Sequence, residues 1–289
     1  MQIVYETCKL LGGEGLGQFF NCRDFSLPLG KKTYIMGILN VTPDSFSDGG
    51  KYNDPEKAVE RAIEMVRNGA DIIDVGGEST RPGFTPVNVE EELTRVIPVV
   101  KILARELNVP ISVDTTKSIV AEKALEAGAH IINDVWGLQK DPDLAGIISK
   151  YDAGVVVMHN KEDTVYTDLM RQVVDFLRKS VEIAINAGIE PDHIAVDPGI
   201  GFGKIFEHNL EVMRNLEALK DLKLPILLGT SRKSFIGKIL DLPVTERVEG
   251  TAATVALGIA KGIDIVRVHD VLEMKRVAKV TDAIIRGMD

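Results

Sequence analysis

From Thr33 to the end of the chain, short apolar runs alternate with longer stretches that mix apolar and charged residues. The short runs have the length and continuous hydrophobicity typical of strands buried on both faces. The stretches between them carry apolar residues three and four positions apart, which is typical of helices. In the first of these stretches, Asp54 is the predicted N-cap, Pro55 the first helical residue and Asn68-Gly69 the end.

Eight strands are predicted in this way, and each is followed by at least one helix. The predicted strands are Thr33–Asn40, Ile72–Gly77, Ile111–Asp114, His130–Val135, Gly154–Met158, His193–Val196, Pro225–Gly229 and Asp264–Val268. The predicted helices after the first are Val89–Glu106, Lys117–Ala127, Pro142–Lys150, Thr167–Asn186, His208–Leu219, Ser234–Leu240, Glu246–Lys261 and Val271–Arg286. Strict alternation predicts an α/β fold with a parallel sheet, and eight units predict closure into a (β/α)8 TIM barrel. A doubly wound open sheet is the alternative, but no G-x-G-x-x-G follows the first strand.

The chain of 289 residues fits one such barrel, and no linker or change of composition divides it. We therefore expect residues 31–289 to form a single α/β barrel domain. Residues 1–30 are irregular and rich in glycine, and residues 25–30 are predicted to form a short hairpin. We interpret residues 1–30 as an N-terminal cap over the bottom of the barrel.

The net charge limits the binding partners that the protein is expected to have, and the cysteine content indicates its cellular compartment. The net charge is −9, which argues against a general affinity for nucleic acid or an anionic membrane. No apolar run approaches the roughly 20 residues that span a bilayer. The two cysteines, Cys8 and Cys22, exclude a disulfide framework, so we expect a reducing, cytoplasmic environment. An anionic substrate would need a local group of Arg and Lys side chains.

Polar residues follow the predicted strands, and in this fold the carboxyl ends of the strands form the catalytic face. Cationic residues suited to phosphate or carboxylate are prominent among them. These are Arg81, Arg232, Lys233, Arg267 and His269. Arg267 and His269 are two positions apart, so they point the same way, and the helix predicted from Val271 adds backbone N–H groups. For Arg267 a surface ion pair is the alternative.

Three strand-end residues have the opposite character: Asp114, Asn133 and Asp197. Each closes an apolar strand, and a buried carboxylate is costly unless donors meet it. A flat heterocycle with an amino-pyrimidinone edge would satisfy two carboxylates and one amide together. An internal hydrogen-bond network that supports the barrel is equally compatible with the spacing.

Other chemical motifs are weak or absent. The segment Gly199–Lys204 does not match G-x-x-x-x-G-K-[ST], so its glycines are expected to allow close approach to a ligand, with Phe202 as an apolar wall. The chain has no H-E-x-x-H and no cysteine cluster, which disfavours a zinc site. It also has no G-x-S-x-G around its serines, which disfavours a serine hydrolase.

Taken together, these motifs closely resemble those of the dihydropteroate synthase family of the folate pathway. The resemblance runs from about residue 33 to the C-terminus. It is carried by Met36–Gly50, Asp71–Gly83, Ser112–Thr115, Ile132–Val135, Asp197–Lys204, Ser231–Gly237 and Arg267–Asp270. Ile205 and Asn160 depart from residues common in the family, and both lie outside the core motifs.

The resemblance implies a TIM-barrel transferase that joins p-aminobenzoate to 6-hydroxymethyl-7,8-dihydropterin pyrophosphate and is inhibited by sulfonamides. It implies a pterin site of Asp114, Asn133, Asp197 and Lys233. It implies a pyrophosphate site of Asn40, Arg81, Arg267 and His269, with Mg²⁺ bound through Asn40. It implies a p-aminobenzoate pocket of Thr80, Pro82, Phe202, Lys233 and Ser234, and Gly229 is also expected among the substrate-binding residues. The loops 41–51 and 80–84 are expected to close over the site, with Phe46 and Asp48 entering it, and the protein is expected to be a homodimer.

A dissociative substitution suits these residues, because p-aminobenzoate is a poor nucleophile and benefits if pyrophosphate leaves early. The expected catalytic residues are Asp114, Asp197, Lys233, Arg267, His269, Phe46 and Asp48. A methyltetrahydrofolate:corrinoid methyltransferase is one alternative, but it would not need Arg81, Lys233 and the Arg267–His269 pair. A non-catalytic pterin-binding paralogue is the other, but we would expect it to have lost the loop residues.

Overall fold

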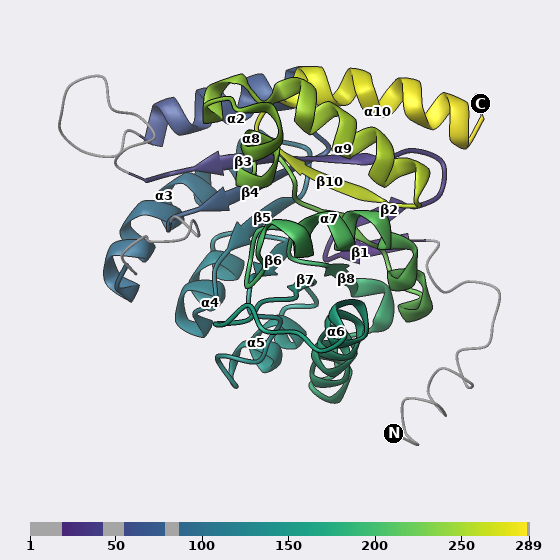
Figure 1. Cartoon of the computed structure of the whole chain (residues 1–289). Helices are drawn as coiled ribbons and strands as arrows, with labels where there is room; N and C mark the ends of the chain where they lie inside the picture. The colour runs from purple at the N-terminus through teal and green to yellow at the C-terminus, as the bar shows by residue number, and fades with distance from the viewer. Residues whose placement is uncertain (1–18, 43–54, 79–86, 288–289) are drawn as a thin grey trace.

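Eight parallel strands form the centre of the computed structural model, which describes residues 19–42, 55–78 and 87–287 (Figure 1). They are β3 (Tyr34–Asn40), β4 (Ile72–Gly76), β5 (Ile111–Asp114), β6 (Ile131–Asp134), β7 (Gly154–Met158), β8 (Ile194–Asp197), β9 (Leu227–Leu228) and β10 (Ile265–Val268). Their order is β8-β7-β6-β5-β4-β3-β10-β9, and a parallel bridge between Val196 and Ile226 joins the two ends of the sheet. The sheet is therefore a nearly closed barrel, and the predicted fold is confirmed.

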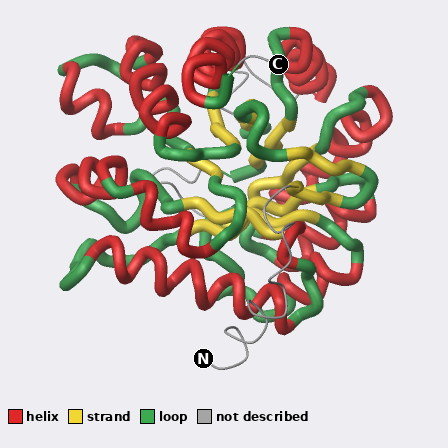
Figure 2. Tube along the Cα trace, turned by 90° about the vertical axis from the view of Figure 1, so that its right-hand side faces the viewer, coloured by secondary structure: helices red, strands yellow, loops and turns green. Residues whose placement is uncertain are grey.

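Helices surround this barrel, as the red tubes outside the yellow strands show (Figure 2). They are α2 (Pro55–Arg67), α3 (Val89–Glu106), α4 (Ser118–Glu126), α5 (Leu144–Lys150), α6 (Leu169–Asn186), α7 (Phe206–Arg214), α8 (Ser234–Leu240), α9 (Val248–Ala260) and α10 (Val271–Ile285). Short 3₁₀ helices are η2 (Pro191–His193), η3 (Leu216–Leu222) and η4 (Val244–Glu246). None of the helices in the described ranges is long and apolar enough to cross a membrane.

Most predicted elements agree with the observed ones to within two residues at each end, and two cases have a visible physical cause. The helix predicted over His208–Leu219 is two elements, α7 and η3, because the chain leaves the α-helical path at Asn215. The Asn215 side chain donates to the backbone oxygen of Glu211 (2.8 Å), a bond that competes with helix continuation. Of the strand predicted over Pro225–Gly229, only β9 is a regular strand, with the Val196–Ile226 bridge before it, and Pro225 has no N–H to give to a ladder. The predicted cap Asp54 lies outside the described residues.

Side chains of the strands divide between two cores, because successive residues of a strand point to opposite faces. The outward-facing residues pack under the helices. They include Ile35, Leu39, Ile73, Val75, Val113, Ile132, Val155, Val157, Val196, Val266 and Val268. The inward-facing residues nearest the strand starts form a separate apolar cluster inside the barrel. They include Tyr34, Met36, Ile72, Ile131, Val156, Ala195, Leu227 and Ile265.

A hairpin closes the amino-terminal end of the barrel. It pairs β1 (Phe19–Cys22) with β2 (Phe25–Pro28), and Figure 1 shows it on the side away from the arrowheads of β3 and β4. Phe20 and Cys22 are fully buried in the inner apolar cluster. The hairpin begins earlier than the predicted one, whose first residue was Phe25. Residues 1–18 lie outside the described ranges, so the division of the chain at residue 30 stays a prediction.

Candidate active site

At the other end of the barrel the inward-facing side chains are polar. Asp114 of β5, Asn133 of β6, Asp197 of β8 and Arg267 of β10 lie in the carboxyl-terminal half of their strands, and Asp74 lies in the middle of β4. Four of them are buried, and Arg267 is close to buried. The parallel strands bring these residues together from positions far apart in the sequence, as predicted for Asp114, Asn133, Asp197 and Arg267.

Arg267 lies at the centre of this group. Its Nε donates to Asp74 Oδ2 (2.6 Å), and its Nη2 donates to Asp114 Oδ2 (2.9 Å). Asn133 Nδ2 donates to the same oxygen of Asp74 at 3.3 Å. Arg267 is therefore ion-paired, as the alternative reading of the sequence had it, but the pair lies inside the barrel and not on the surface. Two carboxylates share one guanidinium here, so the group keeps one negative charge in excess when both are ionised.

The two predicted pterin carboxylates have raised pKa values. Burial raises the pKa of Asp114 to about 7, with Arg267 lowering it and the Asp74 carboxylate raising it further. Burial likewise raises the pKa of Asp197 to about 6, opposed by the backbone N–H of Gly199, which donates to Oδ1 (2.7 Å), and by Lys233. Both carboxyl groups are therefore easier to protonate than an exposed aspartate, and further N–H donors would lower both pKa values. A ligand that presents N–H groups would supply such donors.

Asp74 was not among the predicted site residues. Its side chain is fully buried, and its Oδ1 has no hydrogen-bond partner among the residues that the structure describes. Ser112, its register partner on β5, has a buried Oγ that is likewise without a partner there. A signal was present in the sequence, since Asp74 is the one charged residue inside the apolar run Ile72–Gly76 and shares its inward face with Ile72 and Gly76.

Two other predicted residues lie together: Phe202 in the loop that follows β8, and Lys233 in the segment that follows β9. The Nζ of Lys233 lies 4.1 Å from the centroid of the Phe202 ring. A Cβ built on Gly229 would be 3.7 Å from Asp197 Oδ2, so this glycine borders the pterin carboxylate. Ser234 is exposed at the first turn of α8, directly after Lys233. Gly229 and Lys233 thus lie near Asp197, and Phe202 lies against the Lys233 ammonium.

The segments after β9 and β10 are tied to each other. The backbone N–H of His269 donates to Ser231 Oγ (3.1 Å), and His269 Nδ1 lies 2.9 Å from the same oxygen. Arg232 forms two bonds with Asp270, Nε to Oδ2 at 3.0 Å and Nη2 to Oδ1 at 2.5 Å. Arg232 therefore joins the segment after β9 to the segment after β10 through its ion pair with Asp270. His269 lies two residues before α10 begins at Val271, as predicted for an anion site.

Asn40 is half-buried at the end of β3, opposite Gly76 in the ladder. Within residues 19–42, 55–78 and 87–287, no three His, Cys, Asp or Glu side chains are placed to hold a metal ion. The remaining predicted site residues lie outside the described ranges. They are Phe46, Asp48, Thr80, Arg81 and Pro82.

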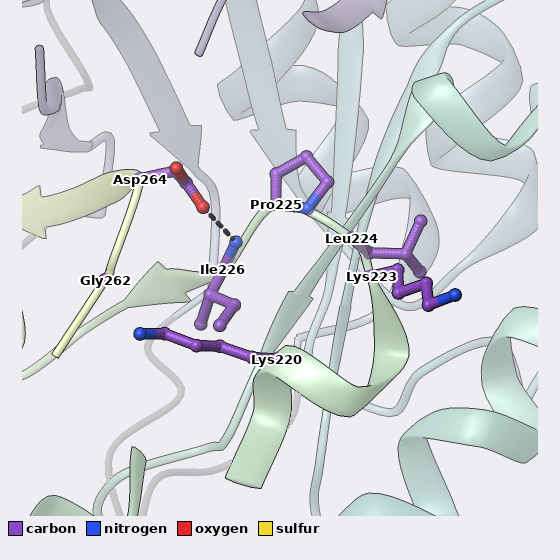
Figure 3. Close-up of a pocket in the computed structure, with 7 residues that line it drawn as sticks. All are labelled: Lys220, Lys223, Leu224, Pro225, Ile226, Gly262 and Asp264. Carbon is purple, nitrogen blue, oxygen red and sulfur yellow. Dashed lines mark hydrogen bonds between the residues drawn. The ribbon is translucent and has the colours of Figure 1, made fainter. Parts of the chain in front are cut away.

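A pocket of about 330 Å³ lies at the opposite end of the barrel, where β9 and β10 begin (Figure 3). It is lined by Lys220, Lys223, Leu224, Pro225, Ile226, Gly262 and Asp264. The backbone N–H of Ile226 donates to Asp264 Oδ2 (3.0 Å), which joins the starts of the two strands. None of the predicted site residues lines this pocket, and in barrels of this kind the amino-terminal end serves stability.

Comparison with known proteins identifies the family of the chain. A family model described as pterin binding enzyme matches residues 36–269. The chain is 56% identical over 259 residues to a dihydropteroate synthase of Clostridium beijerinckii, covering 89% of this chain and 96% of the relative. It is 53% identical over 268 residues to that of Bacillus subtilis, covering 93% and 94%.

Solved structures give the same result. A dihydropteroate synthase from Clostridium difficile, determined in the presence of pteroic acid, superimposes with a TM-score of 0.87 at 58% identity, covering 89% of this chain and 98% of that one. The enzyme from Xanthomonas albilineans with 4-aminobenzoic acid has a TM-score of 0.87 at 39% identity, covering 93% and 98%. The Yersinia pestis enzyme with a sulfonamide drug has a TM-score of 0.86 at 40% identity, covering 92% and 98%.

Proposed function

The chain belongs to the family of pterin-binding enzymes, among the dihydropteroate synthases, and we propose that it joins p-aminobenzoate to 6-hydroxymethyl-7,8-dihydropterin pyrophosphate. The observation that carries the proposal is the ring of polar side chains around Arg267 at the carboxyl end of the barrel. Related enzymes were solved with pteroic acid, which is the proposed product in its oxidised form, and with 4-aminobenzoic acid, which is one of the two proposed substrates.

The pterin ring is proposed to bind between Asp114, Asn133 and Asp197. A pterin edge carries ring and amino N–H groups side by side, and an ionised carboxylate can accept two parallel N–H bonds. Such bonds would favour the ionised form of Asp197, whose pKa burial raises to about 6 in the free site. The Nζ of Lys233 lies 4.1 Å from the centroid of the Phe202 ring, and Lys233 would border the pterin ring on the side of the p-aminobenzoate pocket.

The pyrophosphate is proposed to leave toward Arg267, His269 and the first turn of α10. These groups supply a guanidinium, a ring N–H and backbone N–H groups at a helix start. Arg267 would exchange part of its pairing with Asp74 and Asp114 for the incoming phosphate. His269 is held by Ser231, which fixes the orientation of its ring.

A Mg²⁺ ion that arrives with the pyrophosphate fits the residues present. Mg²⁺ keeps several waters and takes one or two protein ligands together with substrate phosphates. The Asn40 side chain offers one amide oxygen at the rim of the barrel, whereas Asp74 and Asp114 are already engaged by Arg267. Bound there, Mg²⁺ would neutralise charge on the leaving pyrophosphate.

The proposed reaction is a dissociative substitution. The bond between the pterin methylene carbon and the pyrophosphate oxygen breaks first, and its electron pair leaves with pyrophosphate. The aromatic amine then forms the C–N bond and loses one proton. The ionised forms of Asp114 and Asp197 stabilise the cation, and the cationic residues stabilise the leaving group. The roles of Phe46, Asp48, Thr80, Arg81 and Pro82 stay predictions from the family resemblance.

A coupling assay tests the proposal. Purified protein is supplied with the pterin pyrophosphate, p-aminobenzoate and Mg²⁺, and dihydropteroate and pyrophosphate are both quantified. Equal amounts of the two products support the assignment, and p-aminobenzoate is omitted in the control. A folded protein that binds the pterin but forms no product would be the non-catalytic paralogue. Transfer of a methyl group from methyltetrahydrofolate to a corrinoid would instead support the methyltransferase alternative.

Order of binding gives a second test. If pyrophosphate and Mg²⁺ complete the second pocket, p-aminobenzoate should bind poorly to the free protein and well once both are present. Calorimetry with and without the two components measures this. Equal affinity in both conditions would contradict ordered binding. The homodimer and the cytoplasmic location also stay proposals, and light scattering in solution tests the first.

A further inference from the structure

Lys204 is a buried cation that the proposed reaction does not use. Only 9% of the residue is exposed, yet its Nζ reaches three acceptors. It donates to the backbone oxygens of Gly199 (3.0 Å) and Phe202 (3.2 Å), and it lies 2.7 Å from His159 Nδ1. An ammonium group has three N–H bonds, so each has one acceptor here when the His159 ring is neutral.

The neutral state of His159 follows from its surroundings. The residue is 2% exposed, and burial together with the Lys204 charge lowers the pKa of its ring to about 3. The Nδ1 lone pair is then free to accept from Lys204. Burial also lowers the pKa of Lys204 to about 7, opposed by the Asp197 carboxylate. Burying a lysine costs free energy unless acceptors meet its N–H groups, and here three acceptors do so.

The segment that Lys204 binds is the loop Gly199–Gly203, and this loop touches the proposed site twice. Its first residue donates its N–H to Asp197 Oδ1 (2.7 Å). Its Phe202 ring lies under the Lys233 ammonium. The loop thus orients one pterin carboxylate and forms the apolar wall of the p-aminobenzoate pocket.

The loop backbone leaves little room for another arrangement. Gly199, Gly201 and Gly203 all have positive φ values, of 69°, 83° and 54°. A Cβ at Gly199 would come within 1.9 Å of the backbone oxygen of His159, so the loop rests directly on the chain that leaves β7. Neighbouring side chains hold it elsewhere: Tyr166 donates to Gly203 O (2.7 Å), and Gly201 N–H donates to Asn209 Oδ1 (2.6 Å). Lys204 supplies the bonds on the inner side, between these outer supports and the site.

We propose that Lys204, held by His159, is a positioning residue that fixes the loop Gly199–Gly203 and thereby sets both Asp197 and Phe202 for the two substrates. The inference rests on the proposed function for the meaning of the two pockets. Lys204 holds the loop through the backbone oxygens of Gly199 and Phe202, and its charge also lowers the pKa of Asp197.

The test compares Lys204→Met with wild type and with Lys275→Met. Methionine keeps the length and most of the apolar stem but has no N–H groups. Lys275→Met is the matched control, because Lys275 Nζ pairs with Asp71 Oδ2 (3.0 Å) beside the start of β4, at the far end of the barrel. For each protein we would measure kcat, KM for both substrates, the melting temperature and amide hydrogen exchange.

For Lys204→Met we expect KM for p-aminobenzoate to rise and kcat to fall, each about tenfold or more, because small misplacements at a site are costly. Amides of residues 199–204 should exchange about tenfold faster, with those of α6 unchanged. Lys275→Met should lower the melting temperature and leave both KM values unchanged. A Lys204→Met protein that is less stable but has wild-type kinetic constants and loop exchange would overturn the inference.

Two further outcomes are separated by design. If Lys204→Met does not fold, Lys204→Leu, which also has no N–H donor, takes its place, and its kinetic constants decide: a raised KM for p-aminobenzoate supports the inference, and wild-type constants overturn it. If wild type itself forms no dihydropteroate, the proposed function fails. The loop exchange of Lys204→Met then still decides whether Lys204 fixes the loop, since fast exchange supports this and unchanged exchange refutes it.

Discussion

The two ends of the barrel are built from the same eight strands but with opposite chemistry. At the amino-terminal end, apolar residues of the strand starts pack with Phe20 and Cys22 of the hairpin. At the carboxyl-terminal end, Arg267 is shared by Asp74 and Asp114, and Asp197 is buried close by. The first arrangement stabilises the fold by removing apolar surface from water. The second leaves Asp74 Oδ1 without a partner in the described part of the chain and raises the pKa of two carboxyl groups.

This difference indicates how the molecule combines a stable fold with a demanding site. Burying charges costs free energy, and mutual attraction repays the cost only in part. The amino-terminal end can supply stability without taking part in chemistry, whereas the carboxyl-terminal end holds charged groups that a ligand would complete. Substitutions at the two ends should therefore separate stability from activity.

The largest effect is expected for Arg267→Ala, which should lower both the stability of the fold and the activity. Loss of one preorganised donor costs about 2–4 kcal/mol of transition-state stabilisation. Asp74 and Asp114 would also lose their shared partner, and an uncompensated buried charge costs about 3–5 kcal/mol of stability. Steady-state kinetics and denaturant unfolding measure the two losses. Adding Asp74→Asn should recover stability but not activity, and an Arg267→Ala enzyme within about twofold of wild type would refute the assignment.

Phe20→Ala should affect stability alone. Truncating a fully buried phenylalanine costs about 3–5 kcal/mol of the free energy of unfolding. Phe19→Ala is the matched control, because the neighbouring ring is 43% exposed and surface substitutions stay within about 0.5 kcal/mol. kcat and both KM values per folded molecule should be unchanged in either variant. A changed KM in Phe20→Ala would mean that the two ends are coupled.

Asp197→Asn should weaken pterin binding by roughly 1–3 kcal/mol, because one acceptor becomes a donor that faces a ring N–H. A further fall in kcat is expected from the lost charge. Calorimetry measures the pterin affinity, and steady-state kinetics measures kcat. The variant should remain folded, since asparagine keeps the size of the side chain and an oxygen for the Gly199 N–H.

The pH dependence of the same residue gives a further prediction. Its folded pKa of about 6 lies above the ordinary 3.8, so the folded state binds the proton more tightly than the unfolded state. The resulting stability is present below pH 3.8 and is lost as the pH rises to about 6. Asp197→Asn removes this loss, so above pH 6 its melting temperature should not fall below that of wild type. Pterin affinity of wild type should rise with pH through the same window, and a flat profile would exclude the ionised carboxylate as the acceptor.

Ser231→Ala should have the smallest effect of the set. It removes the bonds that orient His269, and one hydrogen bond contributes about 0.5–1.5 kcal/mol. We expect a few-fold higher KM for the pterin pyrophosphate, with kcat for bound substrate less affected. Ser26→Ala in the hairpin is the control at the other end, since Ser26 bonds only Asn21 within the described residues. Equal kinetic effects of the two substitutions would argue against a role for His269 in binding the leaving group.

Much of this architecture could be predicted from local pattern. The apolar runs and the alternation with helices predicted the barrel, and parallel strands then required Asp114, Asn133, Asp197 and Arg267 to meet at one end. The predictions failed where local sequence says little about pairing. The length of β9 depended on which backbone groups found partners, and α7 ended at Asn215 through a side-chain bond that periodicity does not contain.

The sequence by itself determined the order of the elements, the polar end of the barrel and the family to which the chain belongs, because these depend on residue types and on spacings of a few positions. Only the tertiary structure decided which charges pair. Arg267 meets Asp74 across 193 positions and Asp114 across 153, and Lys204 meets His159 across 45. No local pattern encodes such contacts. They follow from barrel closure, which places side chains from distant strands within hydrogen-bonding distance in an interior where water cannot replace a missing partner.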